Sequence, residues 1–158
     1  MPVPVELIDA YLAGGSTLRQ AIHGMTPEQL RARPIPGKWS TLEVVAHLAD
    51  FEPVFADRLK RAIALEKPIV FTADENHFVE KLAYDVRDLG EELALIDATR
   101  LQMGRILKAL PESAFQRVAI HSEKGLVTVE QILRGAVNHI THHLPYIAEK
   151  KAALGVKS

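Results

Sequence analysis

Apolar residues recur along most of the chain at spacings of three and four, the period of an amphipathic α-helix. The most regular series lies between Asp85 and Leu110 and alternates the two spacings, as in a left-handed helix bundle. Segments 4–22, 40–67 and 128–150 carry the same period. The pattern predicts an all-α fold with four long helices, organised as one domain over residues 1–158.

Capping boxes mark three helix starts, because the first and fourth side chains of each box can satisfy each other's backbone N–H groups. They are Thr26–Gln29, Ser40–Glu43 and Thr128–Gln131. Gly14-Gly15-Ser16 interrupts the first segment, so we expect two pieces of helix there. Proline in a helix removes a backbone donor, so we expect a kink at Pro53 and a bend at Pro145.

Two connections are long enough to have structure of their own. Residues 69–84 have the least regular pattern and predict a long crossover with one turn of helix around 76–82. Residues 115–127 carry β-branched residues on either side of a Ser-Glu-Lys-Gly turn, which favours a small hairpin or an extended loop. A four-helix bundle with a long crossover between its second and third helices is therefore the expected architecture.

The composition of the chain limits the kinds of partner and reaction that it predicts. The chain has 158 residues, 25% of them charged, and a net charge of −1, so nothing in it predicts a nucleic-acid surface. No apolar run is long enough to span a bilayer, and the N-terminal residues lack the pattern of a signal peptide, so we expect a cytoplasmic protein without a membrane partner. Cysteine is absent, so any thiol in a reaction has to arrive as a substrate.

Two histidines of the last segment predict a metal site. His139 and His143 stand four residues apart, which places both imidazoles on one helix face, within reach of a single divalent ion. The pair needs a third ligand, and His47 in the second long segment is the best candidate. His142 points about 100° away from His143 around the helix, which favours a surface or supporting position. A ligand pair of His139 and His142 is the geometric alternative. The alternative is that the pair lies on a solvated face and binds nothing.

Three other residues have open roles. Asp50 follows His47 by three residues and either orients the free ring N–H of a ligand or is solvated. Arg100 replaces an apolar residue in the third helical series, so its guanidinium either reaches water or grips a substrate carboxylate near the metal. Both are candidate catalytic residues. His121, on the expected hairpin, is a candidate to line the mouth of a pocket.

The sequence resembles the DinB/YfiT-like superfamily in two places. Gly37-Lys38-Trp39-Ser40, Glu43 and His47-Leu48-Ala49-Asp50 are similar to the family's second-helix motif, and Asn138-His139-Ile140-Thr141-His142-His143 resembles its closing histidine motif. The resemblance implies an up-down-down-up bundle, often a homodimer, with one divalent metal on His47, His139 and His143. Pro145 departs from the family's usual small or polar residue.

Three histidines leave a metal with its charge and an open position, which is typical of catalysis. Because characterised relatives are thiol-dependent, the resemblance favours a thiol-dependent S-transferase that acts on a small molecule. It would use zinc, nickel or iron, with a low-molecular-weight thiol as co-substrate. The alternatives are a metal-dependent hydrolase that uses hydroxide in the same site, and a non-catalytic metal-binding or stress protein.

Overall fold

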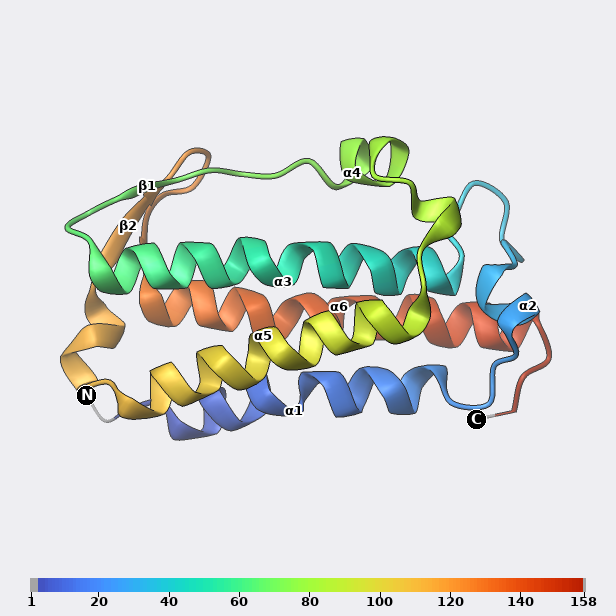
Figure 1. Ribbon diagram of the computed structural model, residues 1–158, viewed down its shortest axis with the longest axis horizontal. Coiled ribbons are helices and arrows are strands. Elements are labelled where there is room, and N and C mark those ends of the chain that lie inside the picture. The colour runs from blue at the N-terminus through green and yellow to red at the C-terminus, as the bar shows by residue number, and fades with distance from the viewer. Residues whose placement is uncertain (1–2, 158) are drawn as a thin grey trace.

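Four long helices lie side by side along the molecule in the computed structural model, which describes residues 3–157 (Figure 1). They are α1 (Val5–Ile22), α3 (Thr41–Ala64), α5 (Leu89–Ala109) and α6 (Val129–Ala153). Helices α1 and α6 run in one direction and α3 and α5 in the other, so the order is up-down-down-up (Figure 1). Each helix packs against two neighbours, because α3 contacts α5 and α6, and α1 contacts the same two. The expected all-α four-helix bundle is confirmed.

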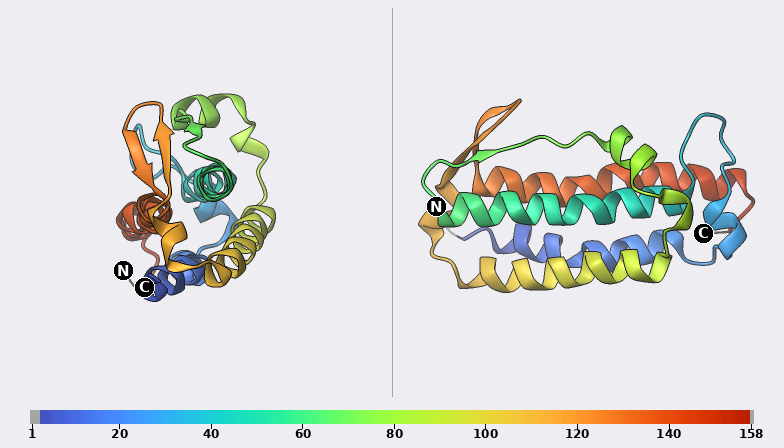
Figure 2. Two further views of the ribbon diagram at one scale, coloured as in Figure 1. Left: turned by 90° about the vertical axis from the view of Figure 1, so that its left-hand side faces the viewer. Right: turned by 45° about the horizontal axis from the view of Figure 1, so that its top comes forward.

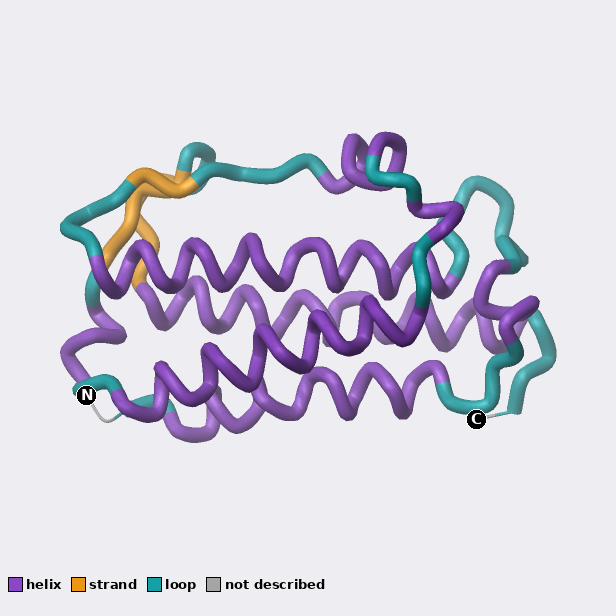
Figure 3. The backbone as a smooth tube through the Cα atoms, in the orientation of Figure 1, coloured by secondary structure: helices purple, strands orange, loops and turns teal. Residues whose placement is uncertain are grey.

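Short elements join the long helices. Helix α2 (Pro27–Arg31) precedes α3, and helix α4 (Glu75–Lys81) and the 3₁₀ turn η1 (Tyr84–Val86) lie in the crossover. The turn η2 (Glu112–Gln116) leads into a hairpin of β2 (Val118–His121) and β3 (Gly125–Thr128), which confirms the hairpin (Figure 3).

The crossover also contributes a strand that the sequence pattern did not reveal. Strand β1 (Ile69–Val70) pairs in parallel with β2, so the sheet has the order β1-β2-β3. Ile120 lies opposite Ile69 on one side and Leu126 on the other. The pairing fastens the start of the crossover to the hairpin, 50 residues further along the chain, where Thr72 N also donates to Ser122 Oγ.

All three capping boxes form as expected. The Ser40 hydroxyl accepts from the backbone N–H of Glu43 at 3.1 Å, and the Ser40 N–H donates to the Glu43 carboxylate at 2.7 Å. The boxes at Thr26 and Thr128 close in the same reciprocal way. Each box fixes where a helix begins, and two of these helices carry the candidate metal ligands.

The expected break at Gly14-Gly15 is wrong, because α1 continues through both glycines. The two residues are buried, and a Cβ at Gly14 would lie 2.8 Å from Cζ of Arg100 and closer still to one of its guanidinium nitrogens. A Cβ at Gly15 would collide with the Asp97 carboxylate in the same way. The glycines therefore allow α5 to approach α1, and the cost of glycine within a helix is offset by that contact.

The third long helix begins later than the pattern suggested. It starts at Leu89, where Asp88 caps the helix by accepting from the N–H of Glu91 at 3.0 Å. Asp85 and Val86 belong to the 3₁₀ turn instead, and Val86 is 72% exposed. Its place in the apolar series was therefore coincidental. Pro53 and Pro145 both lie inside continuous helices, so neither proline ends its helix.

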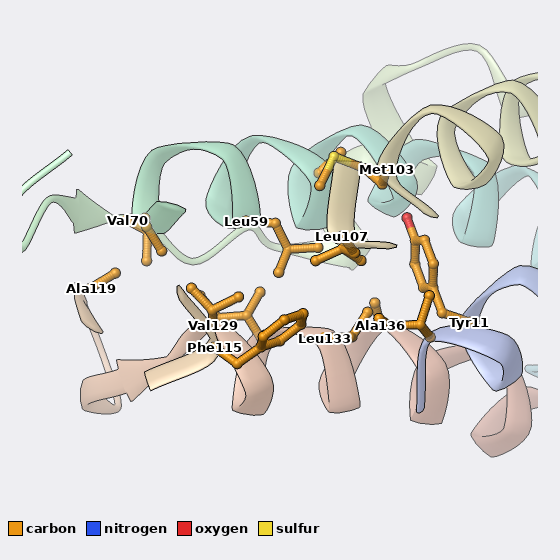
Figure 4. Close-up of a cluster of buried hydrophobic side chains, with 14 residues drawn as sticks. Tyr11, Leu59, Val70, Met103, Leu107, Phe115, Ala119, Val129, Leu133 and Ala136 are labelled. Carbon is orange, nitrogen blue, oxygen red and sulfur yellow. The ribbon is translucent and has the colours of Figure 1, made fainter. Parts of the chain in front are cut away.

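Buried apolar side chains form two clusters along the bundle. One lies at the hairpin end, where Phe115, Leu133 and Leu107 surround Leu59 and reach Tyr11 (Figure 4). The other lies towards α2 and is centred on Leu18, Leu48 and Ile96. Among residues 3–157 no helix is long and apolar enough to cross a membrane.

The crossover and the hairpin both stand on the side of the bundle formed by α3 and α6 (Figure 2). The crossover has to travel the length of the molecule because α3 and α5 run in the same direction (Figure 1). Both segments therefore lie over the pair of helices that carries the three candidate ligands.

Candidate metal centre

Three imidazoles converge between α3 and α6. Nε2 of His47 lies 2.9 Å from Nε2 of His139, and one nitrogen from each of His47, His139 and His143 lies within 4.8 Å of the others. His47 lies on α3, seven residues after the N-cap Ser40. His139 and His143 lie one helical turn apart on α6. The geometry brings together the three residues that the spacing and the resemblance selected.

The surroundings of these rings are apolar and aromatic. The ring centroids of Trp39 and Phe51 lie 5.2 and 4.8 Å from that of His47, and Phe55 lies 5.6 Å from His139. His47 is 3% exposed, and its Nδ1 has no hydrogen-bond partner among the described residues. The α3 side of the site is therefore shielded from bulk solvent.

Burial and mutual repulsion keep the cluster neutral. Burial lowers the pKa of His47 to about 4, although the charge of Asp50 opposes the shift. Burial together with the other histidines lowers the pKa of His139 to about 3 and that of His143 to about 4. Neutral imidazoles present free lone pairs at neutral pH, which is the state that binds a metal.

This donor set fits a divalent ion. Three nitrogens aimed at one point can each reach an ion at about 2.0–2.1 Å after small adjustments of the rings. Three neutral ligands leave the charge of the ion uncompensated and leave room for a further ligand, which favours a catalytic site over a structural one. Imidazole alone does not select among zinc, nickel and iron.

A cavity of about 300 Å³ opens onto the three histidines. Its walls come from α3, α6, the crossover and the hairpin. The lining residues are Trp39, His47, Phe51, Phe55, Arg58, Thr72, Ala73, Glu75, His121, Lys124, His139, His142 and His143.

His121 and His142 both line this cavity. His121 is 7% exposed and its Nδ1 accepts from the backbone N–H groups of Glu123 and Lys124 at 3.2 and 3.3 Å, so it faces the cavity as part of the hairpin turn. His142 is exposed, and its ring lies 5.2 Å from that of His143. It does not belong to the converging set.

Asp50 does not contact the histidine rings through any hydrogen bond of the described residues. Its carboxylate accepts from the hydroxyl of Tyr84 at 2.7 Å and forms an ion pair with Arg87. Asp50 therefore ties α3 to the end of the crossover. It acts on His47 only through its charge.

Arg100 lies inside the bundle and is 2% exposed, so its guanidinium does not reach solvent. It donates to Oε1 of Glu52 at 2.9 and 2.6 Å, to the carbonyl of Tyr11 at 2.7 Å and to that of Ala136 at 2.9 Å. One side chain of α5 thus contacts α1, α3 and α6. The anion that it meets is Glu52 of this chain, and its charge helps to lower the pKa of His139.

Several cavity residues were missed from the sequence alone. Phe51 and Phe55 follow His47 at intervals of four, so the stripe that carries the ligand also carries aromatic rings, and that signal was available. Trp39 packs against the apolar core and also forms a wall of the cavity. No pattern identifies Glu75, because the crossover has no regular period.

The fold is a four-helix bundle in which the antiparallel helices α3 and α6 bring three histidines together. This combination is typical of metal-binding helix-bundle proteins. The chain belongs to the DinB superfamily, whose family model matches residues 10–147. It is 30% identical over 139 residues to YfiT of Bacillus subtilis, covering 87% of this chain and 78% of that protein, and the name of that relative provisionally assigns it as a metal-dependent hydrolase. A Bacillus licheniformis relative with the same provisional description is also 30% identical over 139 residues, covering 87% of this chain and 79% of that protein.

The fold agrees with a solved relative. The structure of Bacillus subtilis YfiT superposes with a TM-score of 0.88 at 28% identity, covering 97% of this chain and 88% of that one. That structure is described as a probable metal-dependent hydrolase with an unusual four-helix bundle topology. The chain thus has both the bundle fold and a group of three histidines that could hold a metal. Its relatives carry names that refer to metal dependence.

Proposed function

We propose that the chain is a metal-dependent hydrolase, with His47, His139 and His143 as the ligands of one divalent ion. The observation that carries the proposal is the convergence of three neutral imidazoles at the floor of a cavity of about 300 Å³. The names of the relatives support the reaction class. A divalent ion at this site supplies a Lewis acid that lowers the pKa of a coordinated water or thiol.

The residues of the chain contribute the remaining parts of a hydrolytic site. Trp39, Phe51 and Phe55 exclude water from the α3 side and hold the apolar part of a substrate. Glu75, the first residue of α4, is the one carboxylate among the described residues that line the cavity. In hydrolysis it is the group placed to accept the proton that the attacking water loses and to return a proton to the leaving group.

A second candidate function is thiol-dependent S-transfer, the reaction that the family resemblance favoured. One observation supports it: Glu75 is exposed and lies on the crossover, so the cavity has no buried acid–base carboxylate among the described residues. Transfer to a thiol needs such a group less than hydrolysis does, because a coordinated thiol loses its proton more readily than water. The thiol has to be a small molecule because the chain has no cysteine.

The test begins with metal analysis of protein purified without an affinity tag. The loaded protein is then incubated with activated carboxylic esters in ¹⁸O-labelled water, and in parallel with a small thiol and an alkyl halide. Hydrolysis is expected to place ¹⁸O in the acid product, whereas S-transfer yields a thioether. A protein that binds a metal at the three histidines but produces neither product would contradict both functions.

Glu75→Gln separates the two reactions. Hydrolysis is expected to fall by a factor of about 10²–10⁴, the usual contribution of a general base, while thioether formation is retained. Glu80→Gln, a change further along the same helix outside the cavity lining, serves as the matched control. Equal rates for Glu75→Gln and Glu80→Gln in hydrolysis would remove Glu75 from the mechanism.

A further inference from the structure

A second hollow adjoins the histidine cavity on the side of the C-terminal half of α6. It has a volume of about 240 Å³, and its lining residues are Gly37, Lys38, Trp39, Val44, His143, Tyr146 and Lys150. Trp39 and His143 line both hollows, so a molecule in the histidine cavity can extend into the second one past these two side chains.

Lys150 is the unusual residue of this second hollow. It is 2% exposed, yet no carboxylate of the described residues lies within ion-pair distance of its ammonium group. Its Nζ donates to the carbonyl of Tyr146 at 3.3 Å, a long hydrogen bond to an oxygen one turn earlier on the same helix. Lysine is almost never fully buried without a partner, because an ammonium removed from water needs compensation. Within residues 3–157 its other two N–H groups meet no acceptor, so they are available for a ligand.

The charges around Lys150 leave the hollow positive. Lys38 lines the same hollow and pairs at 3.4 Å with Glu149, with both side chains about half exposed, so the pair is weak. Burial lowers the pKa of the Lys150 ammonium group, and the charges of Glu149 and Glu43 oppose this shift. The Glu43 carboxylate is already engaged with Arg33 and the N–H of Ser40. The cationic groups that face the hollow therefore outnumber the available anionic ones.

We propose that Lys150 and Lys38 bind an anionic group of the substrate, a carboxylate or a phosphoryl group, while the reactive part of the substrate lies in the histidine cavity. The inference rests on the proposed function, because it takes the histidine cavity as the reaction site. The buried ammonium supplies the charge and the exposed Lys38 closes the outer side. Trp39 and Tyr146 provide flat walls for the part of the substrate that joins its two ends. Substrates with a negative group remote from the reacting bond are thereby preferred to neutral ones.

The test uses the one tryptophan of the chain as its probe. Trp39 lines the second hollow, so its fluorescence reports directly on occupation of the site. Metal-free protein is titrated separately with inorganic phosphate and with acetate at constant ionic strength, using chloride as the balancing anion. We expect a saturable change in fluorescence with at least one of the two anions. The two titrations show whether a phosphoryl or a carboxylate group is preferred.

Variants at two adjacent positions make the test specific. Lys150→Met keeps most of the length of the side chain and removes its charge, so it is expected to weaken binding at least tenfold. Lys150→Arg is expected to retain binding. Lys151→Met is the control, because Lys151 lies on the next position of α6, outside the second hollow, and donates to the carbonyl of His23. Circular dichroism verifies that each variant is folded.

Two results would overturn the inference: a Lys150→Met titration that matches wild type, or no saturable response of wild-type protein to either anion at millimolar concentration. Because the titration involves neither metal nor reaction, its failure leaves the hydrolase proposal intact. An inactive enzyme that still binds the anion at Lys150 would contradict the proposed function and not the site.

Discussion

The candidate metal ligands include His143 but not His142, its neighbour on α6. Replacing His47, His139 or His143 with Ala removes one of three converging nitrogens, so divalent-metal affinity is expected to fall by more than about 100-fold. His142→Ala is the matched control, since His142 lies beside His143 but outside the converging set. Metal titration of the purified variants measures the difference. Loss of binding in His142→Ala with binding kept in His143→Ala would reverse the assignment.

Acid is expected to destabilise the metal-free protein through the same residues. The unfolded chain takes up protons on these histidines near pH 6.5, whereas the folded pKa values of His47 and His143 are about 4 and that of His139 is about 3. The free energy of unfolding therefore falls as the pH drops from about 6.5 towards 4. Chemical denaturation across this range measures the slope. His47→Gln should show a shallower fall, and identical slopes would exclude a contribution from His47.

The buried ion pair of Arg100 and Glu52 is expected to contribute to the stability of the fold. Removing the guanidinium leaves the buried carboxylate of Glu52 without its partner, so Arg100→Met is expected to cost about 3–5 kcal/mol in the free energy of unfolding. Arg61→Met, which breaks an exposed pair with Asp57, should cost less than about 1 kcal/mol. The double variant Arg100→Met with Glu52→Leu should recover much of the loss. A neutral Arg100→Met variant would show that the buried pair adds little.

The sequence pattern identified the three converging histidines better than it identified the charged groups around them. The histidines were found because helical spacing and motif order depend on local sequence. The partner of Arg100 was missed because Glu52 lies 48 positions away and looks like any polar residue of a half-exposed helix. Lys150 was missed for a similar reason: in sequence it resembles its exposed neighbour Glu149, and only packing shows that it is buried. Burial of a charge depends on contacts that the pattern does not contain.

At the scale of elements, the capping boxes predicted three helix starts correctly. The break predicted at Gly14-Gly15 was wrong. A box acts within four residues, so sequence suffices to locate it. The continuity of α1 depends instead on α5, because Arg100 and Asp97 occupy the space that side chains at Gly14 and Gly15 would fill. Strand β1 was missed because its two residues form a strand only by pairing with β2.

The close contact of α1 with α5 predicts that Gly14→Ala destabilises the protein by about 1–3 kcal/mol. The added methyl group would collide with the guanidinium of Arg100, which four hydrogen bonds hold in place. Alanine favours a helix more than glycine does, so propensity alone predicts the opposite sign. Ser16→Ala, at an exposed position of the same helix, should change stability by less than about 0.5 kcal/mol. Thermal and urea denaturation measure both. A stabilised Gly14→Ala variant would show that Arg100 can move.

For the whole molecule, the homodimer expected from the sequence remains a prediction. Several large apolar side chains are exposed, among them Phe71 and Val86 at 72% each, and association would cover some of this surface. Sedimentation velocity at micromolar concentration should give the mass of two chains. The melting temperature should also rise with protein concentration, because association stabilises the folded state. A monomer with a concentration-independent melting temperature would exclude the dimer.

The two parallel helices α3 and α5 have a consequence for how such a protein diversifies. Their shared direction obliges the chain between them to cross the whole bundle. That crossing supplies Thr72, Ala73 and Glu75 to the cavity, while the candidate ligands come from α3 and α6. Under the proposed function, the crossover residues that would contact a substrate and the histidines that would hold a metal therefore lie on separate stretches of sequence. Insertions or exchanges between α3 and α5 can alter substrate choice without touching a ligand. Under the proposed function, one bundle can in this way support different reactions around the same three histidines.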